Sequence, residues 1–178
     1  MTTSNSLPAI GISLGDPSGI GPEIVASALC ELSRSQLDRI RIFGDEAILR
    51  EAFRLIDKDP ILPLSVDNSA SLKVEELQWG LPNSATDKAQ VAYLESAMRA
   101  AKRGTIAGLA TAPISKVAAT RAGFAFPGHT EFLADRLDAA PVAMMFAGPK
   151  LNVVLATVHE AINDLAEVLT RGDDASDG

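Results

Sequence analysis

The sequence is poor in cysteine and histidine and has no long apolar run. Cys30 is the only cysteine, so the chain cannot form an internal disulfide, and no CxxC or Cys/His pattern predicts a structural zinc site. The first residues lack the basic and apolar regions of a signal peptide, and no later stretch reaches the length of a membrane span. From these absences we expect a cytoplasmic protein that contacts no membrane.

Positive charge is also scarce, because 16 Lys and Arg residues stand against 23 Asp and Glu residues, for a net charge of -7. Basic residues do not cluster with aromatic residues in the way that would neutralise a phosphate backbone, so nucleic acid is not an expected partner. The 178 residues and 47% apolar content are enough for a packed domain, with one good core or two modest lobes.

Short apolar runs alternate with stretches of helical periodicity along most of the chain. Strands are predicted at residues 9–14, 39–43, 106–112, 142–146 and 151–158, and helices at residues 23–32, 46–55, 86–103, 115–122 and 131–137. Residues 57–85 predict an irregular excursion or edge strands. The alternation predicts the α/β class, with a mainly parallel sheet covered by helices. The last two strands are expected to form a hairpin through Gly148 and Pro149.

A glycine-rich loop, Gly-Asp-Pro-Ser-Gly-Ile-Gly-Pro at residues 15–22, joins the first predicted strand to the first predicted helix. Free backbone amides at such a junction can bind an anion, which makes the loop similar to a phosphate site. It matches neither the dinucleotide fingerprint nor the P-loop. A tight turn that needs glycine for its backbone angles explains the same residues equally well.

The two histidines are His129 and His159, and each follows a loop or strand signal. His159 comes directly after a predicted strand, where ligands gather in open α/β sheets, although either side chain is also compatible with a structural role. A single histidine cannot bind a metal alone. Lys116 is either a partner for a phosphate or carboxylate or a solvated lysine. Three carboxylates are candidates for acid–base groups or for helix caps: Asp16, Glu23 and Glu131.

Five motifs occur in an order that resembles one known family. They are residues 15–23 (GDPSGIGPE), 89–95 (AQVAYLE), 111–116 (TAPISK), 126–134 (FPGHTEFLA) and 156–159 (ATVH). Each motif is weak alone, and the five in this order resemble the 4-hydroxythreonine-4-phosphate dehydrogenases. The resemblance extends over nearly the whole chain, to about Leu169.

The resemblance implies a fold and an activity. The fold is like that of isocitrate and isopropylmalate dehydrogenases, with two α/β lobes around a cleft and a homodimer whose active site is near the subunit interface. The reaction is the NAD- or NADP-dependent oxidation of a small phosphorylated hydroxy acid, 4-phosphooxy-L-threonine, with decarboxylation. It is a step of pyridoxine and pyridoxal phosphate biosynthesis and requires a divalent metal such as Zn, Mg or Co.

The resemblance also implies roles for three residues. The His-Thr pair of the family that contacts substrate falls on His129 and Thr130, and its first metal-binding histidine falls on His159. Its other metal and substrate residues belong to a C-terminal half that this chain does not contain. We therefore expect residues 1–169 to form the N-terminal part of the fold with an incomplete second lobe, and residues 170–178 to form a disordered acidic tail. Weak or no turnover is expected of this truncated chain.

Alternative functions remain open. Ser115 replaces the His or Asn that often precedes the lysine of the family, which leaves the substrate open. Related enzymes act on threonate or erythronate 4-phosphate, or on a cis-dihydrodiol dicarboxylate. A second hypothesis is a non-catalytic remnant that only dimerises or binds anions.

Overall fold

The computed structural model describes residues 8–60, 63–139, 142–157 and 161–168. The chain divides into two compact units, Met1–Leu137 and Asp138–Gly178. The predicted acidic tail, residues 170–178, lies outside the described residues, as does the end of the predicted segment 1–169. None of the described helices is both long enough and apolar enough to cross a membrane.

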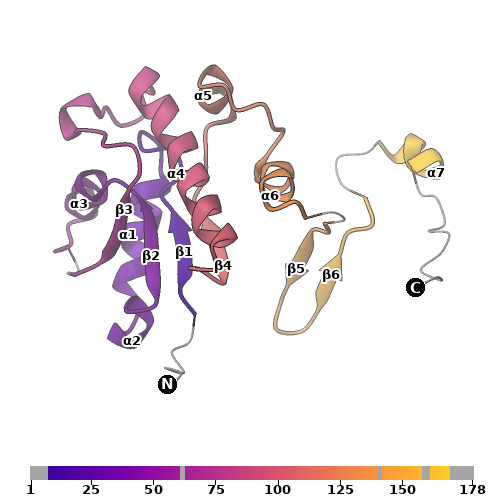
Figure 1. Ribbon diagram of the computed structural model, residues 1–178, viewed down its shortest axis with the longest axis horizontal. Helices are drawn as coiled ribbons and strands as arrows, with labels where there is room; N and C mark the ends of the chain where they lie inside the picture. The colour runs from indigo at the N-terminus through magenta and orange to yellow at the C-terminus, as the bar shows by residue number, and fades with distance from the viewer. Residues whose placement is uncertain (1–7, 61–62, 140–141, 158–160, 169–178) are drawn as a thin grey trace. The chain divides into compact units, whose positions relative to one another are not determined.

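The first unit is built on a parallel sheet (Figure 1). Its strands are β1 (Ile10–Ser13), β2 (Ile40–Gly44), β3 (Ser65–Asn68) and β4 (Gly108–Thr111). They are arranged in the order β3-β2-β1-β4, and every pairing is parallel. Ser13 at the end of β1 is in register with Phe43 on one side and Thr111 on the other. The predicted parallel sheet is confirmed.

The helices of this unit are α1 (Gly21–Cys30), α2 (Arg34–Leu37), α3 (Glu46–Leu55), α4 (Ser84–Lys102), α5 (Lys116–Arg121) and α6 (His129–Leu137), with a 3-10 turn at Val74–Glu76. The bounds of α3 are those predicted. The long helix α4 begins two residues before the predicted start, because the Asn83 side chain accepts hydrogen bonds from the N–H groups of Ala85 and Thr86 and caps it.

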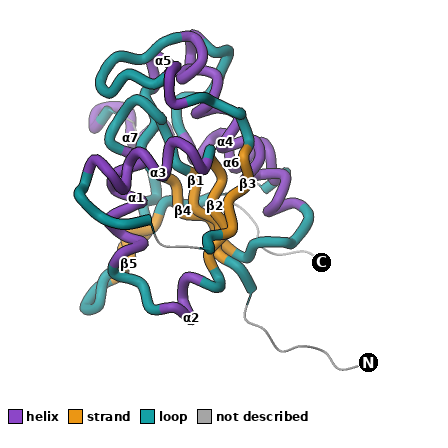
Figure 2. The backbone as a smooth tube through the Cα atoms, turned by 90° about the vertical axis from the view of Figure 1, so that its left-hand side faces the viewer, coloured by secondary structure: helices purple, strands orange, loops and turns teal. Residues whose placement is uncertain are grey.

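Helices cover both faces of the sheet. Successive strand residues point to opposite faces, so Ile42 packs into the core shared with α1 and α3. Its neighbour Phe43 packs on the other face against Ala97 and Ala100 of α4. Figure 2 shows the strands between α1 and α3 on one side and α4 on the other. The helical cover that the sequence predicted is confirmed.

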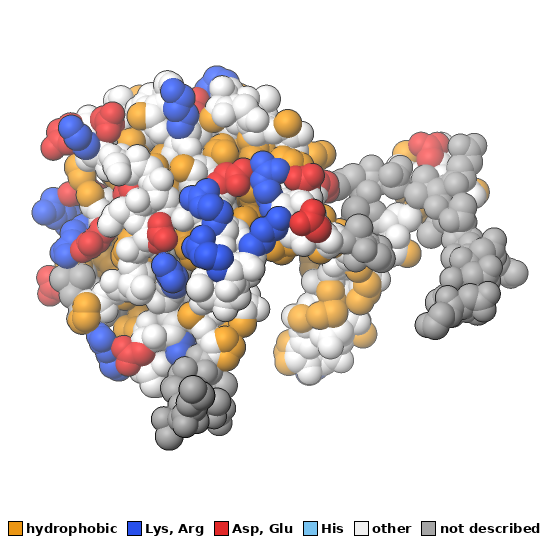
Figure 3. Space-filling model, in the orientation of Figure 1, with side chains coloured by type: hydrophobic (Ala, Val, Ile, Leu, Met, Phe, Trp, Pro, Cys, Tyr) orange, Lys and Arg blue, Asp and Glu red, His pale blue; other side chains and the backbone are white. Residues whose placement is uncertain are grey.

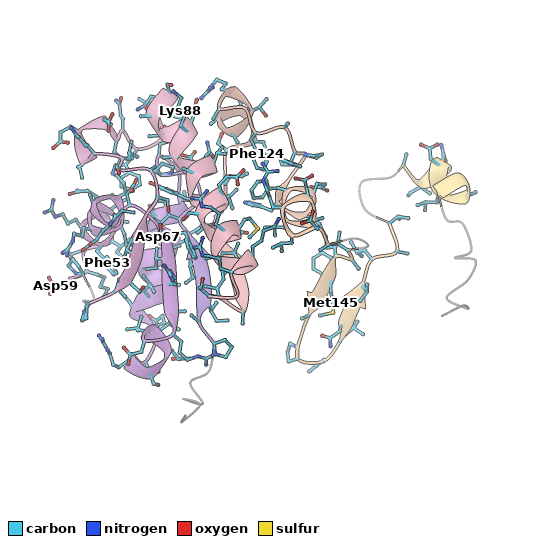
Figure 4. All side chains as sticks on the ribbon, in the orientation of Figure 1. Phe53, Asp59, Asp67, Lys88, Phe124 and Met145 are labelled. Carbon is cyan, nitrogen blue, oxygen red and sulfur yellow. The ribbon has the colours of Figure 1, made fainter. Side chains whose placement is uncertain are left out.

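Strand β3 forms the edge of the sheet within the segment that the sequence left as an excursion or edge strands. Asp67 on β3, labelled in Figure 4, accepts a hydrogen bond from Ser96 Oγ of α4 at 3.2 Å and lies 3.6 Å from the Arg41 guanidinium of β2. The side chain of Asp45 then accepts the N–H groups of Ser71 and Leu72, both at 2.9 Å. These long-range polar contacts fix the path of the excursion.

The second unit contains an antiparallel hairpin of β5 (Met145–Ala147) and β6 (Asn152–Val154), followed by a 3-10 turn (Ile162–Asp164) and α7 (Leu165–Val168). The predicted hairpin through Gly148 and Pro149 is confirmed, although both strands are shorter than predicted. All six strand residues are exposed, and Figure 3 shows hydrophobic side chains gathered on the hairpin. A two-stranded hairpin whose side chains are exposed on both faces has no hydrophobic core of its own.

Candidate functional site

The topology of the sheet indicates where a ligand would lie. From β1 the chain moves to β2 on one side, and it later returns to β4 on the other side. The loops that follow β1 and β4 therefore leave the carboxyl edge of the sheet in different directions. Ligands of open α/β sheets bind in the crevice at such a switch point. The glycine-rich loop and the 112–116 segment both begin at this edge.

The glycine-rich loop makes a tight turn against the segment after β4. Gly15 has a φ of 69°, and a Cβ on it would lie 2.2 Å from the carbonyl oxygen of Pro113. The next N–H, that of Asp16, donates to the same carbonyl at 2.9 Å. Only glycine combines this backbone conformation with this approach. The tight-turn interpretation therefore accounts for Gly15.

Two donors of the same loop, both of Ser18, are satisfied by the loop's own carboxylate. Asp16 is 8% exposed, and its Oδ1 accepts the N–H of Ser18 at 2.9 Å and the hydroxyl of Ser18 at 2.8 Å. A carboxylate placed among these donors opposes a second anion by charge and uses an amide that a phosphate would need. Of the two interpretations that the sequence left open, the geometry favours the turn.

His129 lies at the first position of α6, and Thr130 follows it in the same helical turn. Both side chains are half-buried. The Nε2 atom of His129 is screened from solvent and has no hydrogen-bond partner among the described residues. Burial, and then the positive charge of Lys116, lower the pKa of His129 below its ordinary value. The imidazole is therefore neutral at physiological pH and keeps one donor and one acceptor nitrogen for a ligand.

A buried glutamine anchors the segment after β4. Gln90 of α4 is fully buried, and its Oε1 accepts the N–H of Ser115 at 3.0 Å. Ser115 in turn caps α5, because its hydroxyl accepts the N–H of Ala118 at 3.3 Å. Lys116 is the first residue of α5, so these two contacts set the position from which its side chain leaves the backbone.

An aromatic cluster supports the start of α6. The rings of Phe124, Phe126 and Phe132 lie with their centroids 5.2–5.5 Å apart. The Arg136 guanidinium lies over Phe126 and Phe132 and pairs with Glu95 of α4 at 2.8 Å. Figure 4 labels Phe124 between α5 and α6. Because Phe132 is fully buried three residues after His129, the cluster fixes the helix that presents the histidine.

The carboxylates that the sequence named as acid–base candidates have local structural positions. Asp16 bonds Ser18 within its loop, and Glu23 lies in the first turn of α1. Glu131 lies in the first turn of α6, with Oε2 3.2 Å from where a Cβ of Gly128 would be. Negative charge in a first turn stabilises a helix through its dipole, which accounts for Glu23 and Glu131 without catalysis.

The expected metal ligand, His159, lies outside the described residues. Within the ranges that the structure describes, no three His, Cys, Asp or Glu side chains come together as a metal-binding group. The described residues therefore do not supply a metal site by themselves. A metal bound to His159 would need further ligands.

A hollow of about 390 Å³ lies beside the N-terminus of α4 and the end of α5. In its lining, the buried Asp87 accepts two hydrogen bonds from the Arg121 guanidinium, at 2.8 and 3.1 Å. This contact raises the pKa of Arg121, chiefly through the hydrogen bonds to Asp87. The pair joins α4 to α5. His129 and Thr130 do not line this hollow.

The sheet order and the turn after β1 define an open α/β protein, with the glycine-rich loop and the 112–116 segment at the carboxyl edge of its parallel sheet. The family model described as "Pyridoxal phosphate biosynthetic protein PdxA" matches residues 36–173. The chain belongs to this family. The family predicted from the five motifs is confirmed.

Two relatives have the name of the family that the motifs predicted. The chain is 37% identical to a 4-hydroxythreonine-4-phosphate dehydrogenase of Geobacter metallireducens, over 93% of this chain and 53% of the relative. A protein of the same name from Desulfosudis oleivorans is 35% identical, over 93% of this chain and 53% of that protein. The chain thus spans about half the length of the relatives it matches.

Solved structures resemble the chain over a similar share. A 4-hydroxythreonine-4-phosphate dehydrogenase from Burkholderia phymatum matches 92% of this chain and 53% of its own, with a TM-score of 0.79 and 29% identity. A terephthalate 1,2-cis-dihydrodiol dehydrogenase from Burkholderia xenovorans matches 91% of this chain and 52% of its own, with a TM-score of 0.70 and 30% identity. Both support the dehydrogenase-like α/β fold that the sequence predicted.

Proposed function

We propose that the chain belongs to an enzyme that oxidises 4-phosphooxy-L-threonine with NAD or NADP, with decarboxylation, on the route to pyridoxal phosphate. The observation that supports this most directly is the neutral imidazole of His129, whose Nε2 has no partner among the described residues, in a chain whose relatives are named for this reaction. In such a reaction the nicotinamide accepts a hydride from the carbon bearing the hydroxyl group.

The chain's own residues would bind and orient the substrate. His129 and Thr130 are adjacent on the first turn of α6, so an imidazole nitrogen and a hydroxyl are presented from one rigid turn. The Nε2 atom is screened from solvent, so a ligand reaches it only when the ring or its neighbours move. A substrate oxygen would then supply the missing partner, which an unpaired buried nitrogen otherwise lacks.

Metal binding by His159, a homodimer and a cytoplasmic location also belong to this proposal. A divalent cation on the substrate hydroxyl would favour loss of its proton. The remaining ligands and the completion of the site would come from sequence beyond the half of the relatives that this chain matches. Membership of the family therefore does not by itself make the 178-residue chain catalytically active.

The proposal is tested by following nicotinamide reduction. Purified chain is mixed with 4-phosphooxy-L-threonine, NAD or NADP and a divalent metal, and the His129→Gln variant serves as the control. Reduction that depends on His129 supports the proposal. The assay is repeated with a longer form of the protein that spans the full length of the relatives. If neither nucleotide is reduced by this chain or by the longer form, the proposed reaction is wrong.

A second substrate class is favoured by one structural likeness. The terephthalate 1,2-cis-dihydrodiol dehydrogenase shares the fold at 30% identity. Its named substrate has two carboxylates and no phosphate. Adding a cis-dihydrodiol dicarboxylate and the 4-phosphates of threonate and erythronate to the same assay separates these possibilities, because the preferred substrate has the highest kcat/KM.

A further inference from the structure

Lys116 is a cation that has no ion-pair partner among the described residues, and it follows the segment that leaves β4. It is exposed at the first position of α5. No carboxylate within the described part of the chain forms an ion pair with it, whereas Arg121 on the same helix pairs with Asp87. Its ammonium group is therefore free to bind an anion from solution.

Gln90 fixes the backbone from which this lysine leaves. It lies on α4 among apolar residues that face the sheet, and it is fully buried. Its Oε1 accepts the Ser115 N–H at 3.0 Å, while its Nε2 has no partner in the part of the chain that the structure describes. Leaving a buried donor unpaired costs stability, so an apolar residue would suit this position better if packing were the only requirement. The hydrogen bond to Ser115 explains why a polar side chain occupies this position.

Lys116 and His129 belong to the same local structure. Ile114, which precedes Lys116 by two residues, packs in one hydrophobic cluster with Phe126 and Phe132, which flank His129. Ala119 of α5 and Leu94 of α4 are in this cluster too. Burial lowers the pKa of His129, and the positive charge of Lys116 opposes protonation of the imidazole and lowers that pKa further.

We propose that Lys116 binds the anionic group of the substrate beside His129, and that Gln90 positions Lys116 through its hydrogen bond to Ser115. This rests on the proposed function for the identity of the substrate, which contains a phosphate and a carboxylate. Lys116 supplies a positive charge and His129 a neutral hydrogen-bonding ring. Gln90 is a positioning residue, because it acts through the backbone of Ser115.

The test measures anion binding at His129 directly. The chain has two histidines, so proton NMR resolves their ring signals, and the His129→Gln variant assigns them. Inorganic phosphate, O-phospho-L-serine and L-threonine are titrated separately. We expect saturable shifts of the His129 signals, with the dissociation constant raised about tenfold or more in Lys116→Gln, a loss of about 1.4 kcal/mol. Lys58→Gln, with the same charge change after α3 on the opposite face, should bind as wild type.

The three probes separate the phosphate from the carboxylate. Lys116-dependent binding of phosphate and phosphoserine but not of threonine identifies a phosphate site, and the reverse pattern identifies a carboxylate site. Binding that is equal in wild type and Lys116→Gln for every probe overturns the proposal, as does the absence of binding by all three.

The positioning role of Gln90 has its own readout. In Gln90→Leu, Lys116 loses its anchor, so its charge acts less on His129. We expect the midpoint of the His129 titration without added anion to rise in Gln90→Leu as it does in Lys116→Gln. The double variant should show no further rise, because both changes remove the same effect. A Gln90→Leu variant with a wild-type midpoint and wild-type phosphate affinity contradicts the role.

The midpoint comparison requires that other nearby charges stay constant. Charged groups on the packed elements include Glu131 on α6, the Glu95–Arg136 pair between α4 and α6, and the Asp87–Arg121 pair between α4 and α5. The variants leave all of them in place. Nicotinamide reduction without Lys116-dependent anion binding would refute this inference alone. Lys116-dependent binding without reduction, in this chain and in the longer form, would refute the reaction and leave the anion site.

Discussion

The hydroxyl of Tyr93 donates a hydrogen bond to Asp45 Oδ2 at 2.9 Å, although 48 residues separate the two in the chain. Both residues are buried. Asp45 follows β2 and also accepts the N–H groups of Ser71 and Leu72, whereas Tyr93 lies in the middle of α4. One carboxylate thus connects the sheet, the excursion after β3 and the helix that bears Gln90.

Replacing this tyrosine tests the connection. Tyr93→Phe removes one hydrogen bond to a charged acceptor and keeps the ring, so we expect the free energy of unfolding to fall by about 1–3 kcal/mol. Urea denaturation followed by circular dichroism measures this. An unchanged midpoint would mean that the two backbone donors of Ser71 and Leu72 and the packing of the ring are sufficient without the hydroxyl.

The same pair predicts the behaviour of the protein in alkali. Burial, followed by the negative charge of Asp45, raises the pKa of Tyr93 above its ordinary value. The folded-state pKa is therefore higher than the unfolded value of about 10, so stability is complete below about pH 10 and is lost above it. Tyr93 is the only tyrosine. Its ultraviolet titration should therefore coincide with alkaline unfolding, and a separate titration of the folded protein would contradict the buried contact.

Two glycines with similar backbone angles test the close approach after β1. Gly15 and Gly104 have φ values of 69° and 66°, but only at Gly15 would a Cβ meet other atoms, the nearest at 2.2 Å. Gly104→Ala should cost about 1–2 kcal/mol from backbone strain alone. Gly15→Ala should cost more than that, or prevent folding. Equal losses in thermal denaturation would show that the contact with Pro113 is not rigid.

Acid should weaken the fold through His129. Its folded-state pKa is lowered by burial and then by the Lys116 charge, so the unfolded chain binds protons more readily. The stability contribution is complete above the unfolded pKa of about 6.5 and falls as the pH decreases through that value toward the folded-state pKa. Urea denaturation across this range should show a smaller decline in His129→Gln. Parallel curves for both proteins would argue against the shift.

Much of the first unit could be predicted from the sequence because its signals are local. The apolar run 9–14 and the stretch 46–55 gave β1 and α3 close to their observed bounds, since burial follows the period of each element. The start of α4 could also have been placed correctly, because Asn83 and Ser84 form a capping signal.

The remaining features depend on partners far along the chain. Strand β3 is half exposed and polar. It pairs with β2, and Arg41 of β2 contacts Asp67 of β3, but no local pattern in the sequence indicates either feature. Gln90 lies within the predicted helix 86–103, on the face that the structure buries, and only its bond to Ser115, 25 residues later, gives it a role. A polar residue on such a face was the available signal. His129 and Thr130 came from a family motif, and no periodicity would have found them.

The binding of 4-phosphooxy-L-threonine to the chain tests the central claim most directly. Isothermal titration calorimetry on wild type and on the paired His129→Gln and Thr130→Val variants measures it without requiring turnover, and near-ultraviolet circular dichroism checks that the variants are folded. The account predicts saturable binding that weakens by about tenfold or more in each variant. Equal affinity in folded wild-type and variant proteins would place the substrate elsewhere and contradict it.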